Sequence, residues 1–338
     1  MTASSKELIS IVMPVYVEAA NLADVLKEVH ANLKQSDVSF EFVLIDDGSP
    51  DDTWAVIEEL SKAYPMLRAA RLSRNFGKES ALCAGLEMAS GEAVITMDAD
   101  GQHPPSLLPQ MIRTWSEGGV DIVEATKIHR GKETLFGKMG ARLFYLLWNW
   151  LSGFELKGAS DYKLLNRRVV DAYLQMGERS VFFRGMTAWL GFRRTQIPFE
   201  VATRSGGRSS WSIFRLFRLA LTGITAFSAI PLQIVTFTGV LFLLFAFFFG
   251  LQTLYVYLSG NAVTGFATVI FLLLIIGSLL MISLGIIGEY IARIYDEVKL
   301  RPRYLIGDVI RPANGLSVSS NTGSPTTRPQ TIGYEKHS

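Results

Sequence analysis

Two carboxylates, Asp98 and Asp100, follow directly on an apolar run, VITM at 94–97. Residues i and i+2 of an extended chain point to the same side, so both carboxylates face one way at the end of a predicted buried strand. Carboxylate oxygens are ligands that suit Mg²⁺ or Mn²⁺, and these ions in turn bind phosphate oxygens. An isolated Asp-x-Asp is more often a polar turn, so the surrounding elements must decide between a turn and a metal site.

The amino-terminal part of the chain alternates β-rich runs with helical patterns. The runs predicted as strands are 9–15, 40–46, 67–72, 93–98 and 121–126. Helical spacing is found between the first two strands, around Glu58–Leu60, and over 81–88; the apolar positions of the first helix are Leu22, Val25, Leu26, Val29 and Leu33. This alternation predicts an α/β fold with a mostly parallel sheet and helices on both faces.

In such sheets, ligands bind beyond the carboxyl ends of the strands. Polar or Gly-containing residues follow four successive predicted strands in this chain. They are Pro14, Tyr16 and Glu18 after the first strand, Asp46 to Ser49 after the second, Arg74 to Lys78 after the third, and Asp98 to Asp100 after the fourth. Since these residues gather at one edge of the sheet, they favour a binding site there over four unrelated turns.

The motifs of several enzyme classes are absent. No dinucleotide-binding fingerprint follows the first strand, and Gly77-Lys78-Glu79 lacks the upstream Gly and the Ser or Thr of a Walker A motif. The HxxxH and CxxC zinc spacings are missing. His103, beside Asp100, could be a ligand, but such a His more often lies on a solvated loop. The single Cys83 excludes an internal disulfide and agrees with a reducing compartment. A net charge of +2 without a basic block gives no indication of nucleic-acid binding.

No Asp, Glu, Lys or Arg occurs from Leu219 to Gly288. Two apolar stretches in this region, about 231–258 and 264–289, each exceed the ~20 residues that cross a bilayer. They predict a transmembrane hairpin. Arg and Lys residues flank both stretches and none lies between them, which places both ends in the cytoplasm. The amino terminus shows no apolar stretch typical of a signal peptide.

Two further segments, 135–154 and 211–227, combine basic residues with Trp and Phe, as helices in the membrane interface do. Ordinary core packing is an equally open interpretation of the first. The tail after about 313 is rich in Ser, Thr and Pro and is predicted to be disordered. The expected organisation is a cytoplasmic domain at 1–204, a loop with an interfacial helix at 205–229, the hairpin at 230–292 and a cytoplasmic segment at 293–338.

Four motifs resemble those of glycosyltransferase family 2, which has the GT-A fold. They are VMPVYVEA (12–19), IDDGS (45–49), RNFGKESALCAGL (74–86) and MDADGQHPP (97–105). GASDYKLLNR (158–167), RSGGRSSWS (204–212) and the hairpin are similar to the polyisoprenyl-phosphate glycosyltransferases, the branch with dolichol-phosphate mannose synthase and the bactoprenol glucosyltransferases. The resemblance covers about residues 7–305.

The resemblance implies an inverting transfer of a sugar from a nucleotide sugar to membrane polyprenyl (undecaprenyl) phosphate. The reaction would take place on the cytoplasmic face of the bacterial inner membrane, with Mg²⁺ or Mn²⁺ as cofactor. UDP-glucose is the expected donor; a UDP-4-amino-arabinose derivative, GDP-mannose and UDP-GlcNAc remain open.

The resemblance also implies roles for individual residues. The nucleotide sugar would be bound by Pro14, Tyr16, Glu18, Asp46 or Asp47, Arg74 and Asp98, with Lys78, Arg204, Arg208 and Ser209 over the diphosphate. The metal would be held by Asp98, Asp100 and Gln102, and the acceptor phosphate by Arg130, Lys138 and Arg142. Asp161 occupies the position often proposed as the base. Val17 stands where Asn is usual, and Gly101 where Leu often follows the Asp-x-Asp.

Elementary chemistry favours a different role for Asp161. A phosphate monoester has its second pKa near ~6, so it is mostly dianionic at neutral pH and needs little deprotonation. We therefore expect Asp161 to position Lys or Arg groups, or the sugar, more than to remove a proton.

Other functions fit the sequence less well. A processive polysaccharide synthase is disfavoured because the QxxRW motif is absent and two spans are too few for a polymer channel. A transporter would usually carry ionisable groups within its spans, and a non-catalytic membrane scaffold would not need charged residues at four strand ends. Glycines in the spans, such as Gly239 and Gly277, would permit packing of hairpins in a homo-oligomer.

Overall fold

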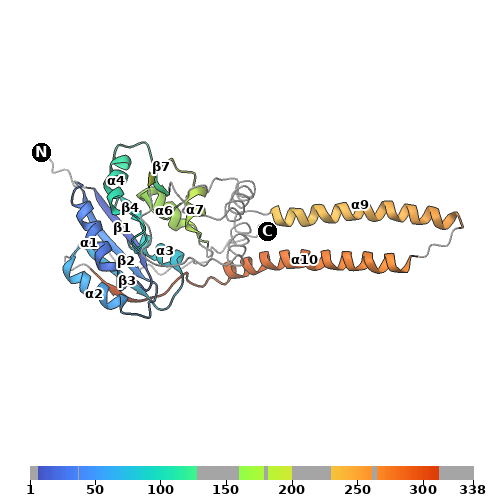
Figure 1. The fold of residues 1–338 in the computed structure, drawn as a ribbon, viewed down its shortest axis with the longest axis horizontal. Coiled ribbons are helices and arrows are strands. Elements are labelled where there is room, and N and C mark those ends of the chain that lie inside the picture. The colour runs from blue at the N-terminus through green and yellow to red at the C-terminus, as the bar shows by residue number, and fades with distance from the viewer. Residues whose placement is uncertain are drawn as a thin grey trace, which may run out of the picture.

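The computed structural model describes residues 7–36, 38–127, 160–178, 182–199, 230–260 and 265–311. An α/β domain lies at one end, and a long helical hairpin extends from it (Figure 1). The strands are β1 (Leu8–Val15), β2 (Ser39–Asp46), β3 (Leu67–Leu72), β4 (Ala93–Thr96), β5 (Ile122–Lys127), β6 (Lys163–Asn166), β7 (Arg194–Phe199) and β8 (Ile306–Ile310). The helices are α1 (Leu22–Leu33), α2 (Thr53–Ala63), α3 (Lys78–Met88), the 3₁₀ helix η1 (Pro105–Leu107), α4 (Leu108–Ser116), α6 (Arg167–Gln175), α7 (Phe183–Trp189), α9 (Ile230–Leu258) and α10 (Phe266–Val298).

The eight strands form one sheet in the order β7-β5-β6-β4-β1-β2-β3-β8. Strands β4, β1, β2 and β3 pair in parallel, as do β5 and β7, whereas β6 and β8 pair antiparallel with their neighbours. The mostly parallel sheet predicted from the alternation of strands and helices is therefore confirmed. Its carboxyl edge collects the segments that follow β1, β2, β3 and β4.

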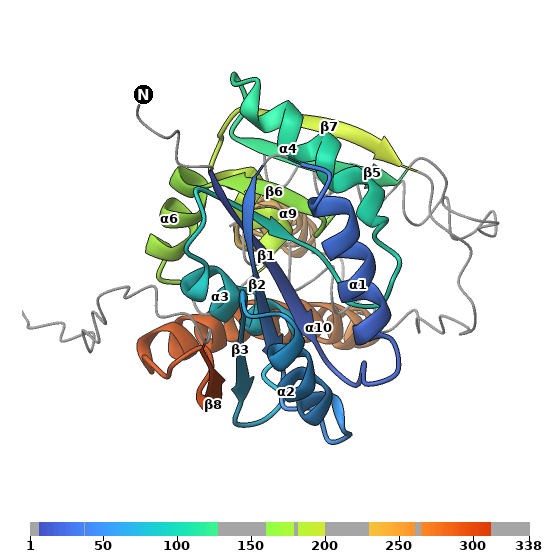
Figure 2. The same cartoon turned by 90° about the vertical axis from the view of Figure 1, so that its left-hand side faces the viewer.

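Two hydrophobic cores cover the two faces of this sheet (Figure 2). Ile9, Ile11 and Met13 of β1 belong to the core with α1, α2 and α4, and Val12 belongs to the core with α3, α6 and α7. β1 is thus buried on both sides, as expected for a strand whose sequence is apolar except at Ser10, and the buried Ser10 hydroxyl donates to Glu41 at 2.6 Å. All five apolar positions predicted for the first helix are buried in α1.

The five predicted strands coincide with β1 to β5 within two residues at each end, but three strands were not predicted. The short β6 carries a buried Lys163, and β8 lies after the hairpin, so neither has a local signature of a strand in this domain. Residues 69–72 of β3 pair antiparallel with 306–310. The segment after 293, expected to be separate, therefore returns to complete the edge of the sheet.

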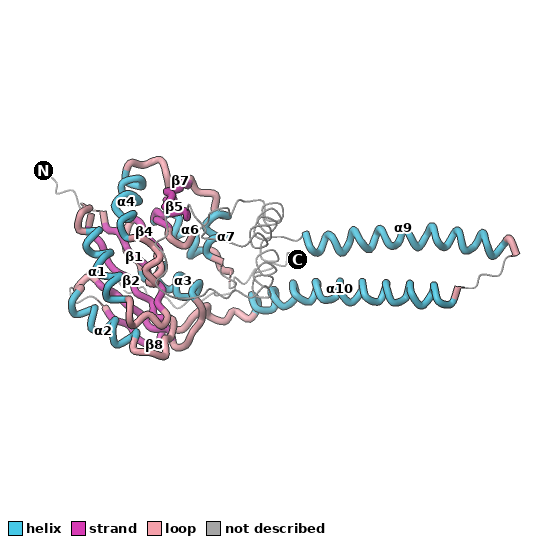
Figure 3. Tube along the Cα trace, viewed as in Figure 1, coloured by secondary structure: helices cyan, strands magenta, loops and turns pink. Residues whose placement is uncertain are grey.

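The hairpin consists of α9 and α10, which run antiparallel (Figure 3). Leu232–Thr253 (22 residues) and Ile275–Val298 (24 residues) are long and apolar enough to cross a membrane. α10 continues past the predicted end of the second span, at 289, and includes Arg293. The segments 135–154 and 211–227, the boundary near 204 and the tail after 313 lie outside the described residues, so those predictions stay predictions.

Candidate active site

A cavity of about 260 Å³ opens beyond the carboxyl ends of β1, β2 and β4. Its lining residues are Pro14, Val15, Tyr16, Glu18, Asp47, Asn75, Gly77, Lys78, Asp98, Ala99 and Asp100. They come from four segments that follow successive parallel strands, so the structure brings together the strand-end residues that the sequence singled out.

The turn after β4 fixes the two carboxylates of the Asp-x-Asp. The backbone N–H of Asp98 donates to Nδ1 of His103 at 2.9 Å, and the Oδ1 of Asp100 accepts from the backbone N–H of Gln102 at 3.0 Å. Gly101 lies between them with φ +72°, a conformation in which Gly is favoured. His103 is 4% exposed and its ring stacks on Tyr162 at 4.9 Å. The expectation that His103 lies on a solvated loop is wrong, because His103 is buried beneath this turn, between the backbone N–H of Asp98 and the ring of Tyr162.

The neighbouring carboxylates Asp46 and Asp47 have different environments. Asp47 lines the cavity and accepts the backbone N–H groups of Phe76 and Gly77 at 2.7 and 2.9 Å. Burial raises the pKa of Asp47, against the lowering effect of these hydrogen bonds. Asp46 is fully buried and does not line the cavity; it accepts the backbone N–H of Ser49 at 3.0 Å and pairs with Arg71 at 3.3 Å. Asp46 thus holds the turn that presents Asp47.

Arg74 also lies outside the cavity lining. Its guanidinium carbon lies 4.0 Å from the centroid of the Phe76 ring, and Nη1 donates to the carbonyl oxygen of Asn75 at 3.0 Å. The structure therefore places Arg74 on the segment that borders the cavity, with its charge against that segment.

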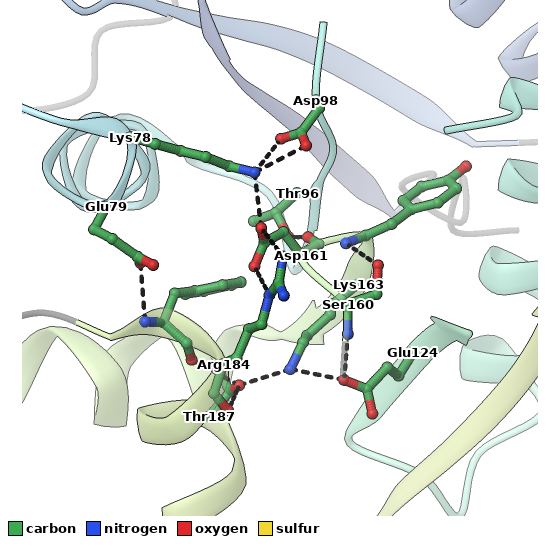
Figure 4. Close-up of polar contacts among 12 residues, drawn as sticks. Lys78, Glu79, Thr96, Asp98, Glu124, Ser160, Asp161, Lys163, Arg184 and Thr187 are labelled. Carbon is green, nitrogen blue, oxygen red and sulfur yellow. Dashed lines mark hydrogen bonds and ion pairs between the residues drawn. The ribbon is translucent and has the colours of Figure 1, made fainter. Parts of the chain in front are cut away.

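A chain of alternating charges leads away from the cavity (Figure 4). Nζ of Lys78 lies 2.6 Å from Oδ1 of Asp98 and 2.7 Å from Oδ2 of Asp161. Arg184, on α7, donates to both oxygens of Asp161, with Nε to Oδ1 and Nη2 to Oδ2, each at 2.7 Å. Burial alone would raise the pKa of Asp161, but the hydrogen bonds and charges of Arg184 and Lys78 hold it well below its usual range.

Buried polar contacts fix the base of this chain (Figure 4). The Thr96 hydroxyl donates to the carbonyl oxygen of Asp161 at 2.6 Å, which ties the end of β4 to the segment before β6. Lys163 and Glu124, both at most 3% exposed, form an ion pair of 2.9 Å. Lys163 also donates to the hydroxyl of Thr187 at 2.8 Å, one helical turn beyond Arg184. Strands β5 and β6 thereby hold α7 in place.

Glu79 is a partly buried carboxyl group beside the charge chain. Its Oε2 accepts the backbone N–H of Phe183, the first residue of α7, at 2.9 Å. Burial, together with the nearby charge of Asp161, raises the pKa of Glu79 from 4.5 to about 7, although the charges of Lys78 and Arg184 oppose the shift. Glu79 therefore joins α3 to the helix that carries Arg184.

This raised pKa predicts a specific dependence of stability on pH. The unfolded chain releases the Glu79 proton near pH 4.5 and the folded chain near pH 7, so the folded state binds more protons between these values. Its free energy of unfolding falls as pH rises through this window. We expect Glu79→Gln, which keeps an acceptor for Phe183, to gain thermal stability relative to wild type from pH 5 to 7 and to hold that gain at pH 8. The measurement is thermal unfolding of the full chain in detergent; the exposed Glu117→Gln is the control, and a pH-independent difference for Glu79→Gln would refute the assignment.

Val17, at the rim of the site, has a strained backbone. Its φ is +56°, the left-handed region that a β-branched residue rarely adopts, and its N–H donates to the hydroxyl of Ser49 at 3.0 Å. Such a conformation costs on the order of 1–3 kcal/mol, whereas Asn tolerates it better.

We expect Val17→Asn to raise the free energy of unfolding by about 1 kcal/mol, measured by thermal or denaturant unfolding. Val17→Thr keeps the β-branch and is the matched control, with no expected gain. Equal stability of the Asn and Thr variants would show that the strain is relieved elsewhere.

Some predicted residues lie outside the described part of the chain. They are Arg130, Lys138, Arg142, Arg204, Arg208 and Ser209. Conversely, the sequence interpretation missed Arg184 and Glu79. Glu79 lies within the motif RNFGKESALCAGL but reads there as an ordinary acidic residue of a first helical turn, and Arg184 is recognised only by its contact with Asp161.

Comparison with known proteins gives the chain a family. Residues 10–183 match the family model described as glycosyl transferase family 2. The chain belongs to glycosyltransferase family 2. It is a glycosyltransferase with the GT-A fold, as the resemblance implied.

Relatives match this glycosyltransferase over nearly its whole length. The prophage bactoprenol glucosyl transferase homolog of Escherichia coli K12 is 36% identical over 300 residues, which cover 88% of this chain and 98% of the relative. The bactoprenol glucosyl transferase of Shigella phage SfII is 36% identical over 303 residues, covering 88% and 97%. The polyprenyl-phosphate branch of the family is thereby confirmed.

Among solved structures, the chain is similar to glucosyl-3-phosphoglycerate synthase from Mycobacterium tuberculosis in complex with Mn²⁺, UDP-glucose and phosphoglyceric acid. The identity is 20%, the TM-score is 0.44, and the match covers 65% of this chain and 78% of that one.

Proposed function

We propose that this glycosyltransferase moves glucose from UDP-glucose to the phosphate of a membrane polyprenyl phosphate, with inversion at the anomeric carbon. The observation that carries the proposal is that Asp98, Asp100 and Lys78 line one cavity at the carboxyl edge of the sheet. Such a set of residues can accommodate a diphosphate together with its divalent cation. The names of the relatives, which print a glucosyl group and bactoprenol, support glucose as the sugar that is transferred and a polyprenyl lipid as the acceptor.

The residues of the cavity fit a divalent cation. Asp98 and Asp100 offer carboxylate oxygens from one short turn, and Mg²⁺ typically takes one or two carboxylates and completes its coordination with phosphates and water. Among the described residues no group of three or more His, Cys, Asp or Glu could hold a metal without such help. Asp98 and Asp100, with Gln102, would hold Mg²⁺ or Mn²⁺, which would neutralise charge on the leaving diphosphate.

Each residue of the cavity has a proposed task. Pro14, Tyr16 and Glu18 border the space for the nucleoside, and Asp47 presents its carboxylate beside them. Lys78, fixed between Asp98 and Asp161, offers a positive charge to the diphosphate as negative charge grows on it. Burial lowers the pKa of Lys78, but the adjacent carboxylates outweigh it and raise the pKa, so the amine stays charged.

The hairpin supports a lipid acceptor. α9 and α10 both extend from the side of the α/β domain on which α7 lies (Figure 1). A polyprenyl chain is costly to remove from a bilayer, so the site must be held close to the membrane surface. We place the α/β domain on the cytoplasmic face of a bacterial inner membrane, with Arg130, Lys138 and Arg142 near the acceptor phosphate. We also infer a homo-oligomer packed through the hairpins.

A transfer assay tests this proposal. Purified full-length protein is incubated with undecaprenyl phosphate, Mg²⁺ or Mn²⁺ and, separately, UDP-glucose, UDP-4-amino-arabinose derivatives, GDP-mannose and UDP-GlcNAc. Mass spectrometry identifies the lipid product, and we expect a hexosyl phosphate lipid from UDP-glucose. If only another donor supports transfer, its sugar replaces glucose in the assignment. Absence of transfer from every donor would refute the proposal.

A further inference from the structure

Asp161 is fully engaged by two cations. Its Oδ1 accepts from Nε of Arg184, and its Oδ2 accepts from Nη2 of Arg184 and from Nζ of Lys78, each at 2.7 Å. The pair of parallel bonds to Arg184 is the fork geometry in which a carboxylate fixes the plane of a guanidinium. Asp161 is 6% exposed, so its negative charge acts on its protein partners and not on solvent. Its position is suited to holding Arg184 still.

Arg184 retains binding capacity after this contact. A guanidinium has five N–H donors and does not lose its proton in proteins. Among the described residues, its hydrogen bonds to Asp161 use one N–H of Nε and one of Nη2, which leaves the two N–H groups of Nη1 and the second of Nη2 for a ligand. The side chain is 44% exposed, whereas that of Asp161 is 7% exposed. A fixed and partly exposed guanidinium is a good ligand for a phosphate dianion.

The charge chain gives Arg184 and Lys78 different places in the site. Lys78 and Asp98 line the cavity, while Arg184 reaches Asp161 from the opposite side (Figure 4). α7, which carries Arg184, lies on the side of the domain from which the hairpin extends (Figure 1). A phosphate on a membrane lipid would therefore meet Arg184, and a nucleotide diphosphate in the cavity would meet Lys78.

We propose that Arg184, oriented by Asp161, binds the phosphate group of the lipid acceptor. The inference rests on the proposed function, since it names the group that receives one of its two substrates. The phosphate oxygen attacks the anomeric carbon, a C–O bond forms to it, and the bond from that carbon to the diphosphate breaks. The diphosphate leaves with the electron pair, and no proton has to reach Asp161. Arg184 holds the phosphate in line for this attack and screens its charge from the donor.

The test compares Arg184→Lys with Arg193→Lys in the full-length protein. Lys keeps the charge at 184 but cannot make the fork to Asp161. Arg193, which pairs with Asp121 at 3.2 Å and is 67% exposed, provides the same substitution of an ion-paired Arg away from the cavity. We expect Arg184→Lys to raise the KM for undecaprenyl phosphate about tenfold, equivalent to ~1.4 kcal/mol. Its KM for the nucleotide sugar and its unfolding temperature should match those of wild type, and Arg193→Lys should change none of these.

Direct binding separates this inference from the proposed function. Binding of a short-chain polyprenyl phosphate to wild type and Arg184→Lys is measured without any donor, and about tenfold weaker binding is expected for the variant. Equal affinity would overturn the role of Arg184 even if wild type transfers sugar. A loss of donor affinity as large as the loss of acceptor affinity would also overturn it, because that result indicates a structural role.

Discussion

Replacing both Asp98 and Asp100 by Asn is expected to lower sugar transfer by about 10³-fold or more, the scale found when groups that stabilise a leaving charge are lost. Asn keeps the size and a carbonyl acceptor at each position but removes the anionic oxygens that a divalent cation requires. The fold should tolerate the change, since Asp100 is exposed and the Asp98 side chain is 27% exposed. Transfer rates at saturating substrates, measured over a range of Mn²⁺ concentrations, give the effect.

The single variants divide this effect between the two carboxylates. Asp98→Asn also removes one of the two anionic partners of Lys78, so Lys78 then pairs with Asp161 alone. Asp100→Asn preserves an acceptor for the backbone N–H of Gln102, so any loss of transfer activity in this variant reports on metal binding alone. Asp171→Asn, whose side chain is 55% exposed on α6, is the control. If the double variant retained transfer, the proposed metal site at Asp98 and Asp100 would be refuted, whereas the assignment to the family would stand.

The cavity could be predicted from the sequence because it follows from topology. Parallel strands carry their following loops to one edge, so knowing where β1, β2 and β4 end is enough to bring Glu18, Asp47 and Asp98 together. The limits of β3 were predicted to the residue, since Pro65 lies two residues before it and the polar Ser73, Arg74 and Asn75 follow it. These signals are local in sequence and do not depend on distant contacts.

The resemblance pointed to Asp161 and the chemistry of the acceptor suggested cations beside it, but the sequence did not show which cations, because the contacts of Asp161 are long-range. Asp161 meets Lys78 across 83 positions of sequence, and Arg184 meets Asp161 from a different element. β8 reaches β3 only after the chain has passed through the whole hairpin. Asp46 and Asp47 show the same limit in another form, since adjacent carboxylates look alike in sequence, and only their hydrogen bonds separate the turn from the cavity.

Asp161→Asn is expected to lower turnover by roughly 10- to 100-fold, the range for a reacting group misplaced by about 1 Å, and to leave the pH profile unchanged. The neutral amide offers one acceptor oxygen in place of two anionic ones, so Arg184 loses its fork and Lys78 loses a charge partner. A general base works best with a pKa near the operating pH. The cations hold the pKa of Asp161 well below its usual range, which makes this carboxylate a weak proton acceptor.

The pH dependence of kcat and of kcat/KM decides between positioning and base catalysis. A loss of about 10³-fold or more together with disappearance of the acidic limb would show that Asp161 removes a proton, contrary to this prediction. If Asp161 acts through Arg184, the effects of Asp161→Asn and Arg184→Lys on the KM for the acceptor overlap, and the double variant is little worse than the more severe single one. If the two residues acted independently, the fold-changes in the KM for the acceptor would multiply in the double variant. Because a phosphate dianion needs no base, the carboxylate is most useful to this enzyme as the fixed anion that orients a cation.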